Sequence, residues 1–188
     1  MVRACYVGVL VSVISCSTAG VAFAQDDTDR IAEVLCVGDP ECLALATHRL
    51  SAERLRTMFA VDRELVTLMK KVPDLEKRMD ELATSIDPQR RLREITVAAQ
   101  VHDGIPEIAH ILRKHKTTGR EYMLTHTVAM VTAMTYESLP PEARRAGRNG
   151  VPSEVITPAL RFWLSMDATL KAEADAWRKM RGYDKLNR

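Results

Sequence analysis

Residues 122–136, with the sequence YMLTHTVAMVTAMTY, contain no Asp, Glu, Lys or Arg. A helix that is uncharged on all sides is normally surrounded by other helices. Just before this stretch, Thr118 and Glu121 have the spacing of a capping box, in which a hydroxyl and a carboxylate satisfy backbone N–H groups at a helix start. We therefore predict a buried central helix over about residues 119–138.

The segments around this stretch also have helical patterns. Ser51 is a suitable N-cap, and apolar residues then recur at steps of three and four up to about Val72. Pro73 opens the next helical segment, and Pro106 opens a shorter one. No region shows sustained two-residue alternation, so no strand is predicted. The predicted fold is all-α: a compact bundle of five to seven helices around the central helix.

Residues 139–152 form the one clear loop of the predicted bundle. This segment is rich in Pro and Gly and carries three arginines, so we expect it to be mobile or to face a partner. After it, a last continuous helix is expected from Pro158 to a stop at Gly182.

The first 24 residues have the features of a secretory signal peptide. A positive charge near the start is followed by an almost wholly apolar run over residues 7–14, and then by small residues at Ala22 and Ala24. The apolar run is shorter than the ~20 residues that a membrane-spanning helix needs, and no later stretch is long enough. We therefore expect a signal peptide over 1–24 and a single helical domain over 25–188, without a transmembrane segment.

Cys16 offers a second interpretation of the same segment. Residues 13–16, Val-Ile-Ser-Cys, fit a loose bacterial lipobox, which would make Cys16 a lipid-bearing first residue. Leu is usual where Val13 stands, and the residues after Cys16 are apolar rather than a polar tether, so cleavage after Ala24 is favoured. We expect an exported protein of the periplasm, with lipid anchoring through Cys16 as the alternative.

The overall charge of the chain is balanced. It has 27 Lys and Arg against 25 Asp and Glu, a formal net charge of +2. A nucleic-acid-binding protein needs clustered Lys and Arg to neutralise phosphates, so this class of protein is not expected. The local basic clusters at residues 90–93 and 144–148 are interpreted as solvated helix ends.

Cys36 and Cys42 are the two cysteines that follow the predicted cleavage site. In an oxidising compartment an isolated pair indicates a disulfide. The Gly-Asp-Pro sequence over residues 38–40 is turn chemistry that could bring the two ends together. The spacing is not that of a redox Cys-x-x-Cys or a haem motif, and no second pair is present for zinc. We predict a structural disulfide between Cys36 and Cys42.

Three ionisable residues fall on otherwise apolar helix faces. They are Asp62 in the helix after Ser51, His126 on the uncharged helix, and Asp167 in the last helix. Because buried charge is costly, we expect these groups to meet one another, an arginine or a backbone donor. In one interpretation the acids neutralise a partly buried Arg or His, or lie at the wet margin of the apolar stripe. In the other, Asp62, His126 and Asp167 form a metal site or a proton-transfer cluster.

Methionines also concentrate on the apolar faces: Met58 on the helix after Ser51, and Met123, Met130 and Met134 on the central helix. Methionine on a helical stripe is usually adaptable core filler. Gathered in a groove, these four would suit a hydrophobic ligand or a client peptide, and thioethers beside an imidazole would suit Cu(I). We predict no cofactor, and we keep the groove as a candidate ligand site.

Residues 105–124 contain a short Pro-started segment, IPEI, and later the run KTTGREYML, in which a Thr cap and a Glu-Tyr pair lead into the central helix. This part of the chain, about a fifth of it, resembles a pattern in uncharacterised exported helical proteins of Gram-negative bacteria. The resemblance implies a helical bundle and export, and no activity is attached to it.

The chain has none of the common catalytic motifs. It lacks His-Glu-x-x-His, Gly-x-Ser-x-Gly, Ser-x-x-Lys and a phosphate-binding Gly loop. We therefore expect a non-enzymatic exported protein that binds a protein partner or a small apolar ligand in the cell envelope, of an accessory, chaperone-like or immunity type. Its contact surface would be the basic 140–152 segment and the adjoining helix ends. The alternative is a metal-binding or metal-carrying periplasmic protein that uses Asp62, His126, Asp167 and nearby methionines.

Overall fold

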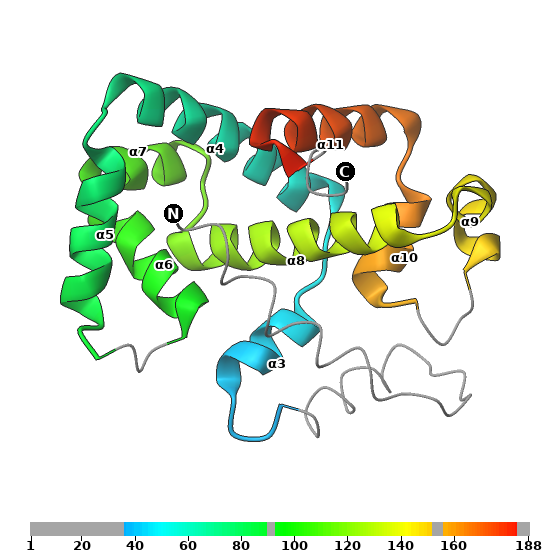
Figure 1. Ribbon diagram of the computed structural model, residues 1–188, viewed down its shortest axis with the longest axis horizontal. Coiled ribbons are helices and arrows are strands. Elements are labelled where there is room, and N and C mark those ends of the chain that lie inside the picture. Colours follow the sequence, from blue (N-terminus) through cyan, green and yellow to red (C-terminus); the bar gives the residue numbers. More distant parts are fainter. Residues whose placement is uncertain (1–35, 90–92, 152–155, 184–188) are drawn as a thin grey trace.

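The computed structural model describes residues 36–89, 93–151 and 156–183 (Figure 1). Within these ranges the regular elements are nine α-helices and one 3₁₀-helix, with no strand. The prediction of an all-α bundle is therefore confirmed. The predicted signal peptide, including Cys16, lies outside the described residues.

The helices follow one another with short connections. In chain order they are α3 (Pro40–Thr47), α4 (Ala52–Lys71), α5 (Leu75–Ile86), α6 (Glu94–Gly104), α7 (Pro106–Lys114), α8 (Gly119–Ser138), α9 (Pro141–Ala146), the 3₁₀-helix η1 (Gly147–Gly150), α10 (Pro158–Ser165) and α11 (Ala168–Arg181). None of the described helices is long and apolar enough to cross a membrane.

α8 is the central helix of the bundle, and Figure 1 shows it running through the middle of the molecule. It begins at Gly119 after Thr118, whose Oγ1 accepts a hydrogen bond from the Glu121 N–H at 3.1 Å. The carboxylate of Glu121 pairs with Arg54 of α4 at 2.8 Å. α8 contacts α3, α4, α6, α7 and α10. No residue in the range 122–136 is exposed, so the prediction of a helix enclosed by its neighbours is confirmed.

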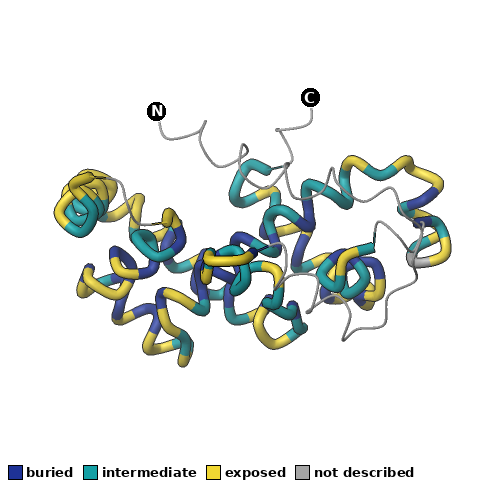
Figure 2. Tube along the Cα trace, turned by 90° about the horizontal axis from the view of Figure 1, so that it is seen from below, coloured by how far each residue is buried: buried dark blue, intermediate teal, exposed yellow. Residues whose placement is uncertain are grey.

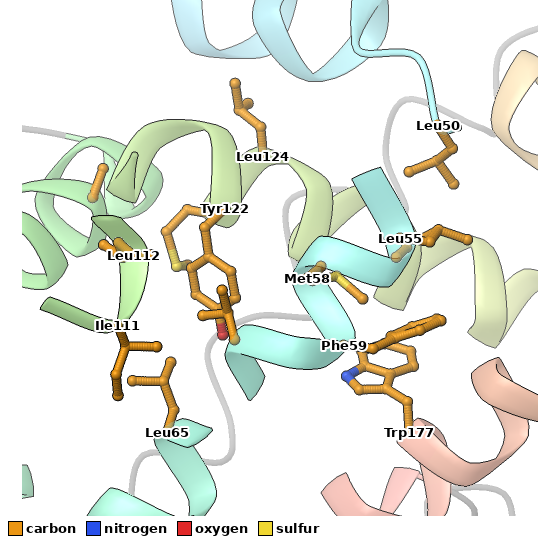
Figure 3. Close-up of a cluster of buried hydrophobic side chains, with 14 of the residues drawn as sticks. Leu50, Leu55, Met58, Phe59, Leu65, Ile111, Leu112, Tyr122, Leu124 and Trp177 are labelled. Atoms are coloured by element: carbon orange, nitrogen blue, oxygen red, sulfur yellow. The ribbon is translucent and has the colours of Figure 1, made fainter. Parts of the chain in front are cut away.

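α4 packs its apolar face against α7, α8 and α11. Ser51 caps it as predicted, with Oγ accepting the Arg54 N–H at 3.2 Å. Leu55 and Met58 are at most 1% exposed and lie in one cluster with Trp177 of α11 (Figure 3). Burying one such side chain contributes about 1.5–3 kcal/mol to the stability of the fold. Figure 2 shows that the buried segments lie where the helices face one another.

α6 and α8 approach each other closely at Gly119. The backbone N–H of Gly119 donates to Oδ1 of Asp103 at 2.8 Å, so a carboxylate of α6 satisfies a free N–H at the start of α8. A Cβ atom at Gly119 would clash with the carbonyl oxygen of Ala99. Glycine is therefore required here for the close approach of two backbones.

In the described part of the 139–152 segment, residues 139–151, the chain does not form the irregular loop that its Pro and Gly content predicted. Pro141 is the first residue of α9, a position where its missing N–H costs nothing, and residues 147–150 form η1. Ala143 and Val151 are buried against α10 in a second, smaller apolar core. This burial holds the segment against the bundle. Its prolines and glycines lie at the ends of short helices and do not form an irregular loop.

The last predicted helix is divided in two. α10 ends at Ser165, and Asp167 caps α11, its carboxylate accepting the Leu170 N–H at 2.7 Å. This break and α9 help to bring the described helices to nine, above the five to seven expected. Two short helices joined by a cap keep nearly the same apolar spacing as one long helix, which is why the pattern did not separate them. Gly182 ends α11 with φ 73°, as predicted.

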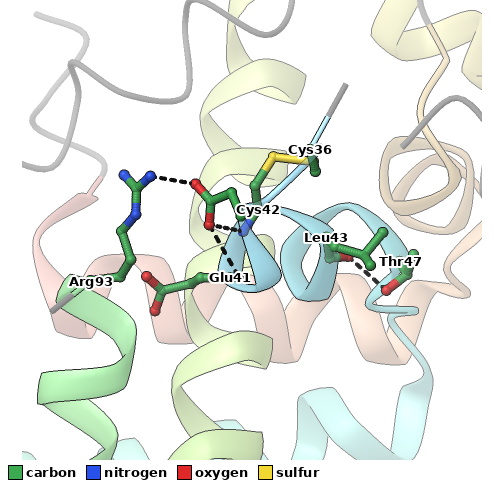
Figure 4. The surroundings of a disulfide bond; sticks show 7 residues. Cys36, Glu41, Cys42, Leu43, Thr47 and Arg93 are labelled. Atoms are coloured by element: carbon green, nitrogen blue, oxygen red, sulfur yellow. Dashed lines mark hydrogen bonds and ion pairs between the residues drawn. A yellow bond between two sulfur atoms is a disulfide. The ribbon is translucent and has the colours of Figure 1, made fainter. Parts of the chain in front are cut away.

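The Sγ atoms of Cys36 and Cys42 lie 2.09 Å apart, at the distance of the predicted disulfide (Figure 4). The turn that they close contains Gly38 in the left-handed region, with φ 76°, where glycine is favoured. Asp39 then caps α3 by accepting the Cys42 N–H at 3.0 Å.

Two polar contacts attach this turn to the start of α6. Oδ2 of Asp39 lies 2.5 Å from a guanidinium nitrogen of Arg93. Glu41, which is 8% exposed, accepts the Thr96 N–H at 2.8 Å and so satisfies a free donor in the first turn of α6. Burial raises the pKa of Glu41, and the hydrogen bonds from Thr96 offset part of this effect. The disulfide turn is thus a structural connection between α3 and α6.

Candidate functional site

The most polar part of the interior surrounds Asp62, in the middle of α4. This carboxylate is 0% exposed. Oη of Tyr122 donates a hydrogen bond to Oδ1 at 2.7 Å, and Nε1 of Trp177 donates to Oδ2 at 2.5 Å. A guanidinium nitrogen of Arg181 lies 3.6 Å from Oδ1. The buried charge therefore has two neutral donors and one counterion, as the cost of burying a charge requires.

His126 lies on α8, one turn beyond Tyr122, and faces the same carboxylate. Its Nε2 is 3.7 Å from Oδ2 of Asp62 and 3.4 Å from the hydroxyl of Tyr183. Ring centroids of Tyr122, Trp177 and Tyr183 lie 5.7, 5.9 and 6.4 Å from the imidazole. Burial lowers the pKa of His126 to about 4, although the charge of Asp62 acts in the opposite direction. The imidazole is therefore neutral at pH 7.

His102 of α6 extends this arrangement. Its ring lies 5.3 Å from that of Tyr122, and its Nδ1 donates to the carbonyl oxygen of Ala98 at 2.7 Å. Burial also lowers the pKa of His102. The pKa of Tyr122 is raised well above its ordinary value, first by burial and then by the neighbouring carboxylate. The Tyr122 hydroxyl therefore keeps its proton and remains a donor to Asp62.

Arg181 supplies the positive charge of the group. Burial alone would lower its pKa, but the attraction of Asp62 and the nearby tyrosines outweighs burial, so the pKa lies above its ordinary value. Its guanidinium carbon also lies 6.0 Å from the ring centroid of Tyr183. We name the six residues that meet here the Asp62 cluster: Asp62, Tyr122, His126, Trp177, Arg181 and Tyr183.

The arrangement of the Asp62 cluster is that of a structural connection between helices. Each oxygen of Asp62 already accepts a hydrogen bond, and the side chain has no exposed surface. Proton transfer to a substrate requires a group within hydrogen-bond reach of that substrate. A carboxylate enclosed between α4, α8 and α11 does not meet this requirement, whereas it ties the three helices together through named polar contacts.

Two of the three predicted polar residues thus lie together, and the third does not. Asp62 and His126 are neighbours, but Asp167 is an exposed helix cap, so its predicted place on a buried face is wrong. The sequence could not separate the two roles of Asp167. An Asp that lies three residues before an apolar residue can be on the same helix face as that residue, or it can be the N-cap of a helix that contains it.

Sequence reasoning did not identify Trp177 and Arg181 as partners of Asp62, or Tyr183 as a neighbour of His126. Trp177 and Arg181 are four residues apart, the spacing that places two side chains on one helix face. That spacing could have associated them with each other. Nothing in the periodicity indicated that α11 packs on α4.

The described residues bring together no group of three or more His, Cys, Asp and Glu side chains that could hold a metal ion. The candidate methionine groove is also not formed as an open feature. Met58 and Met123 are 1% and 7% exposed and belong to the main core, while Met130 and Met134 are half-buried. The first two therefore act as core filler.

A hollow of about 190 Å³ lies where the C-terminal end of α8 meets α9, α10 and α11. Its apolar lining comes from Tyr136, Trp163, Met166 and Ala174. Its charged lining comes from Glu137, Arg144, Lys171 and Asp175. Through Arg144 this hollow borders the basic segment that is predicted to be a contact surface.

Comparison with known proteins found no match of any kind: no family model, no curated protein and no solved structure is significantly similar to this chain.

Proposed function

We propose that this chain is an exported, non-enzymatic helical protein that binds a protein partner or a small apolar ligand in the cell envelope. The observation that carries the proposal is the contrast between the two polar regions. The carboxylate of Asp62 is enclosed, and each of its oxygens already accepts a hydrogen bond. The hollow beside α9 is partly open to solvent and lies next to a basic segment. Ligand sites of helical proteins are concave and lie between helices, and this hollow has such a position.

Export is the second part of the proposal. The pattern of residues 1–24 supports cleavage after Ala24 and release into the periplasm, with lipid attachment at Cys16 as the alternative. The pair Cys36 and Cys42 supports an oxidising compartment, because disulfides persist there.

The metal-binding alternative receives no support from the arrangement of side chains. Its proposed ligands were Asp62, His126, Asp167 and nearby methionines, but Asp167 caps α11, and Met58 and Met123 are buried in the apolar core. Asp62 and His126 remain neighbours, and both oxygens of Asp62 already accept hydrogen bonds from Tyr122 and Trp177.

Native mass spectrometry of the protein isolated from its own periplasm tests this function. We expect a chain that begins at Gln25, contains one disulfide, and carries a protein partner or an organic molecule. A chain that retains residues 1–24, or one that carries a stoichiometric metal ion in place of a partner or ligand, would contradict the proposal. Isolation of a chain with lipid on Cys16 would select the anchored form.

A further inference from the structure

The disulfide turn carries the group that caps α6. Arg93 stands just before the first residue of α6, and its guanidinium has donors only, so it cannot accept a backbone N–H of the first turn. Oε1 of Glu41 accepts the Thr96 N–H instead, at 2.8 Å. Thr96 is the third residue of α6, a position whose N–H an N-cap side chain normally accepts. Glu41 of α3 therefore takes the role of an N-cap for α6.

A second carboxylate of the same turn lies at the same helix end. Oδ2 of Asp39 forms an ion pair with Arg93. Oδ1 of Asp39 accepts the N–H groups of Glu41 and Cys42, at 3.2 and 3.0 Å. Both acids lie within residues 36–42, the ring that the disulfide closes (Figure 4). The closed ring thus holds two carboxylates beside the start of α6.

The position of these carboxylates depends on the disulfide. α3 has only eight residues, and helices shorter than about 12–15 residues are marginal in water. Gly38 in the ring has a positive φ, and an open chain leaves glycine many other conformations. Opening of the ring therefore lets Asp39 and Glu41 leave α6. The other end of α3 stays attached, because Nε2 of His48 lies 3.0 Å from Oγ1 of Thr125.

The ring lies where a reductant can reach it. It stands at one edge of the molecule, at the start of α3 (Figure 1), and Val37 within it is 81% exposed. Cys42 is half-buried and Cys36 is 6% exposed, so Cys42 is the cysteine that a thiolate reaches more easily. Exposed disulfides are the class that exchanges readily with thiols.

We propose that the disulfide between Cys36 and Cys42 is a redox-sensitive control of the α6 cap. The reductant is a protein dithiol, whose thiolate attacks Sγ of Cys42, forms a mixed disulfide and releases the thiolate of Cys36, which takes up a proton. The second thiolate of the reductant then displaces Cys42, so the reductant is oxidised to its own disulfide and the chain gains two thiols. Glu41 leaves Thr96 and the first turn of α6 frays, while the rest of the bundle stays folded. This device is independent of the partner or ligand that the protein binds.

Amide exchange measured by NMR tests the device, with the isotope-labelled periplasmic protein before and after reduction by dithiothreitol. The Thr96 N–H reports on the cap, because Glu41 is its acceptor. The Leu170 N–H is a matched internal control, because Asp167 accepts it at the same position of α11. Reduction should speed exchange of the Thr96 amide about tenfold and leave that of Leu170 unchanged.

Variants separate the cap from general stability. In Glu41→Ala the Thr96 amide should exchange fast in both redox states, so reduction should have no further effect on it. The matched control Glu53→Ala, at an exposed position in the first turn of α4, should respond to reduction like the wild type. The double variant Cys36→Ser, Cys42→Ser should exchange Thr96 fast without dithiothreitol and should not respond to it.

Four results would each overturn the inference. The first is a disulfide that dithiothreitol does not reduce in the folded protein, seen as an unchanged mass. The second is an unchanged Thr96 amide after reduction. The third is equal acceleration of Thr96 and Leu170, which would mean that the disulfide stabilises the whole bundle. The last is a full response to reduction in Glu41→Ala.

Discussion

At the residue scale, the interior depends on Asp62. A carboxylate without exposed surface persists because Tyr122 and Trp177 donate to it and Arg181 balances its charge. Replacing such a buried group and its partners together by apolar residues is often neutral, whereas removing one member is costly. What the Asp62 cluster contributes is therefore a specific arrangement of α4, α8 and α11, more than a large net stability.

Asp62→Ala should lower the free energy of unfolding by about 3–5 kcal/mol. The partly buried guanidinium of Arg181 would lose its counterion, and two buried donors would lose their acceptor. Asp62→Asn should lower the free energy of unfolding by less than Asp62→Ala does, because its amide oxygen still accepts one hydrogen bond. Urea unfolding followed by far-ultraviolet circular dichroism measures both variants. The control is Asp80→Ala on the exposed face of α5, which should stay within about 0.5 kcal/mol of the wild type. Equal stability of Asp62→Ala and Asp80→Ala would contradict the structural role.

The sequence indicated that Asp62 and His126 lie on faces turned inward, since charge on an apolar stripe must find a partner. It did not indicate that the partners are Tyr122, Trp177 and Arg181. Helical periodicity assigns a residue to a face of its own helix, but contacts between helices depend on how the faces are arranged in space.

At the element scale, capping residues marked most of the helix ends correctly. Ser51, Thr118 and Gly182 all have the roles that their positions predicted. Asp167 was misassigned, because an Asp among apolar residues was taken as a charged residue on a helix face. Asp is also a preferred N-cap, and this property identifies the break between α10 and α11 in retrospect. The same reasoning explains α9, since Pro141 is well suited to a first helical position.

Asp167→Ala should destabilise the protein by about 1 kcal/mol, because the Leu170 N–H loses its capping acceptor. Asp167→Asn keeps an acceptor at the same place and should retain most of the stability. Thermal unfolding of the two variants, measured side by side, makes the comparison. If Asp167→Ala and Asp167→Asn are equally destabilised, the loss is one of charge, and the assignment of Asp167 as a side-chain cap is wrong.

At the scale of the whole molecule, three partly or fully buried histidines couple stability to pH. Burial lowers the pKa of His48, His102 and His126 in the folded protein. In the unfolded chain these groups titrate near 6.5, so the unfolded state binds more protons as the pH falls. The stability from these groups is therefore fully present above pH 6.5, and it is lost as the pH falls toward the folded values.

For His126, with a folded pKa of about 4, lowering the pH from 7.5 to 5 should cost about 2 kcal/mol of unfolding free energy. Urea midpoints at the two pH values measure this loss. His126→Gln removes the titrating group, so its midpoint should shift less over the same interval, even if its stability at pH 7.5 is lower. An equal shift in the wild type and in His126→Gln would show that His126 is not the buried neutral group described.

The central claim is that α8 is the enclosed core element of an all-helical bundle, tied to α4 and α11 at Asp62. Native-state hydrogen exchange over residues 122–136 tests it most directly. Amides in this range should exchange only through global unfolding, and more slowly than those of α5 and α9. Exchange of residues 122–136 at the rate of α5 or faster would show that this helix is not enclosed, and would contradict the account.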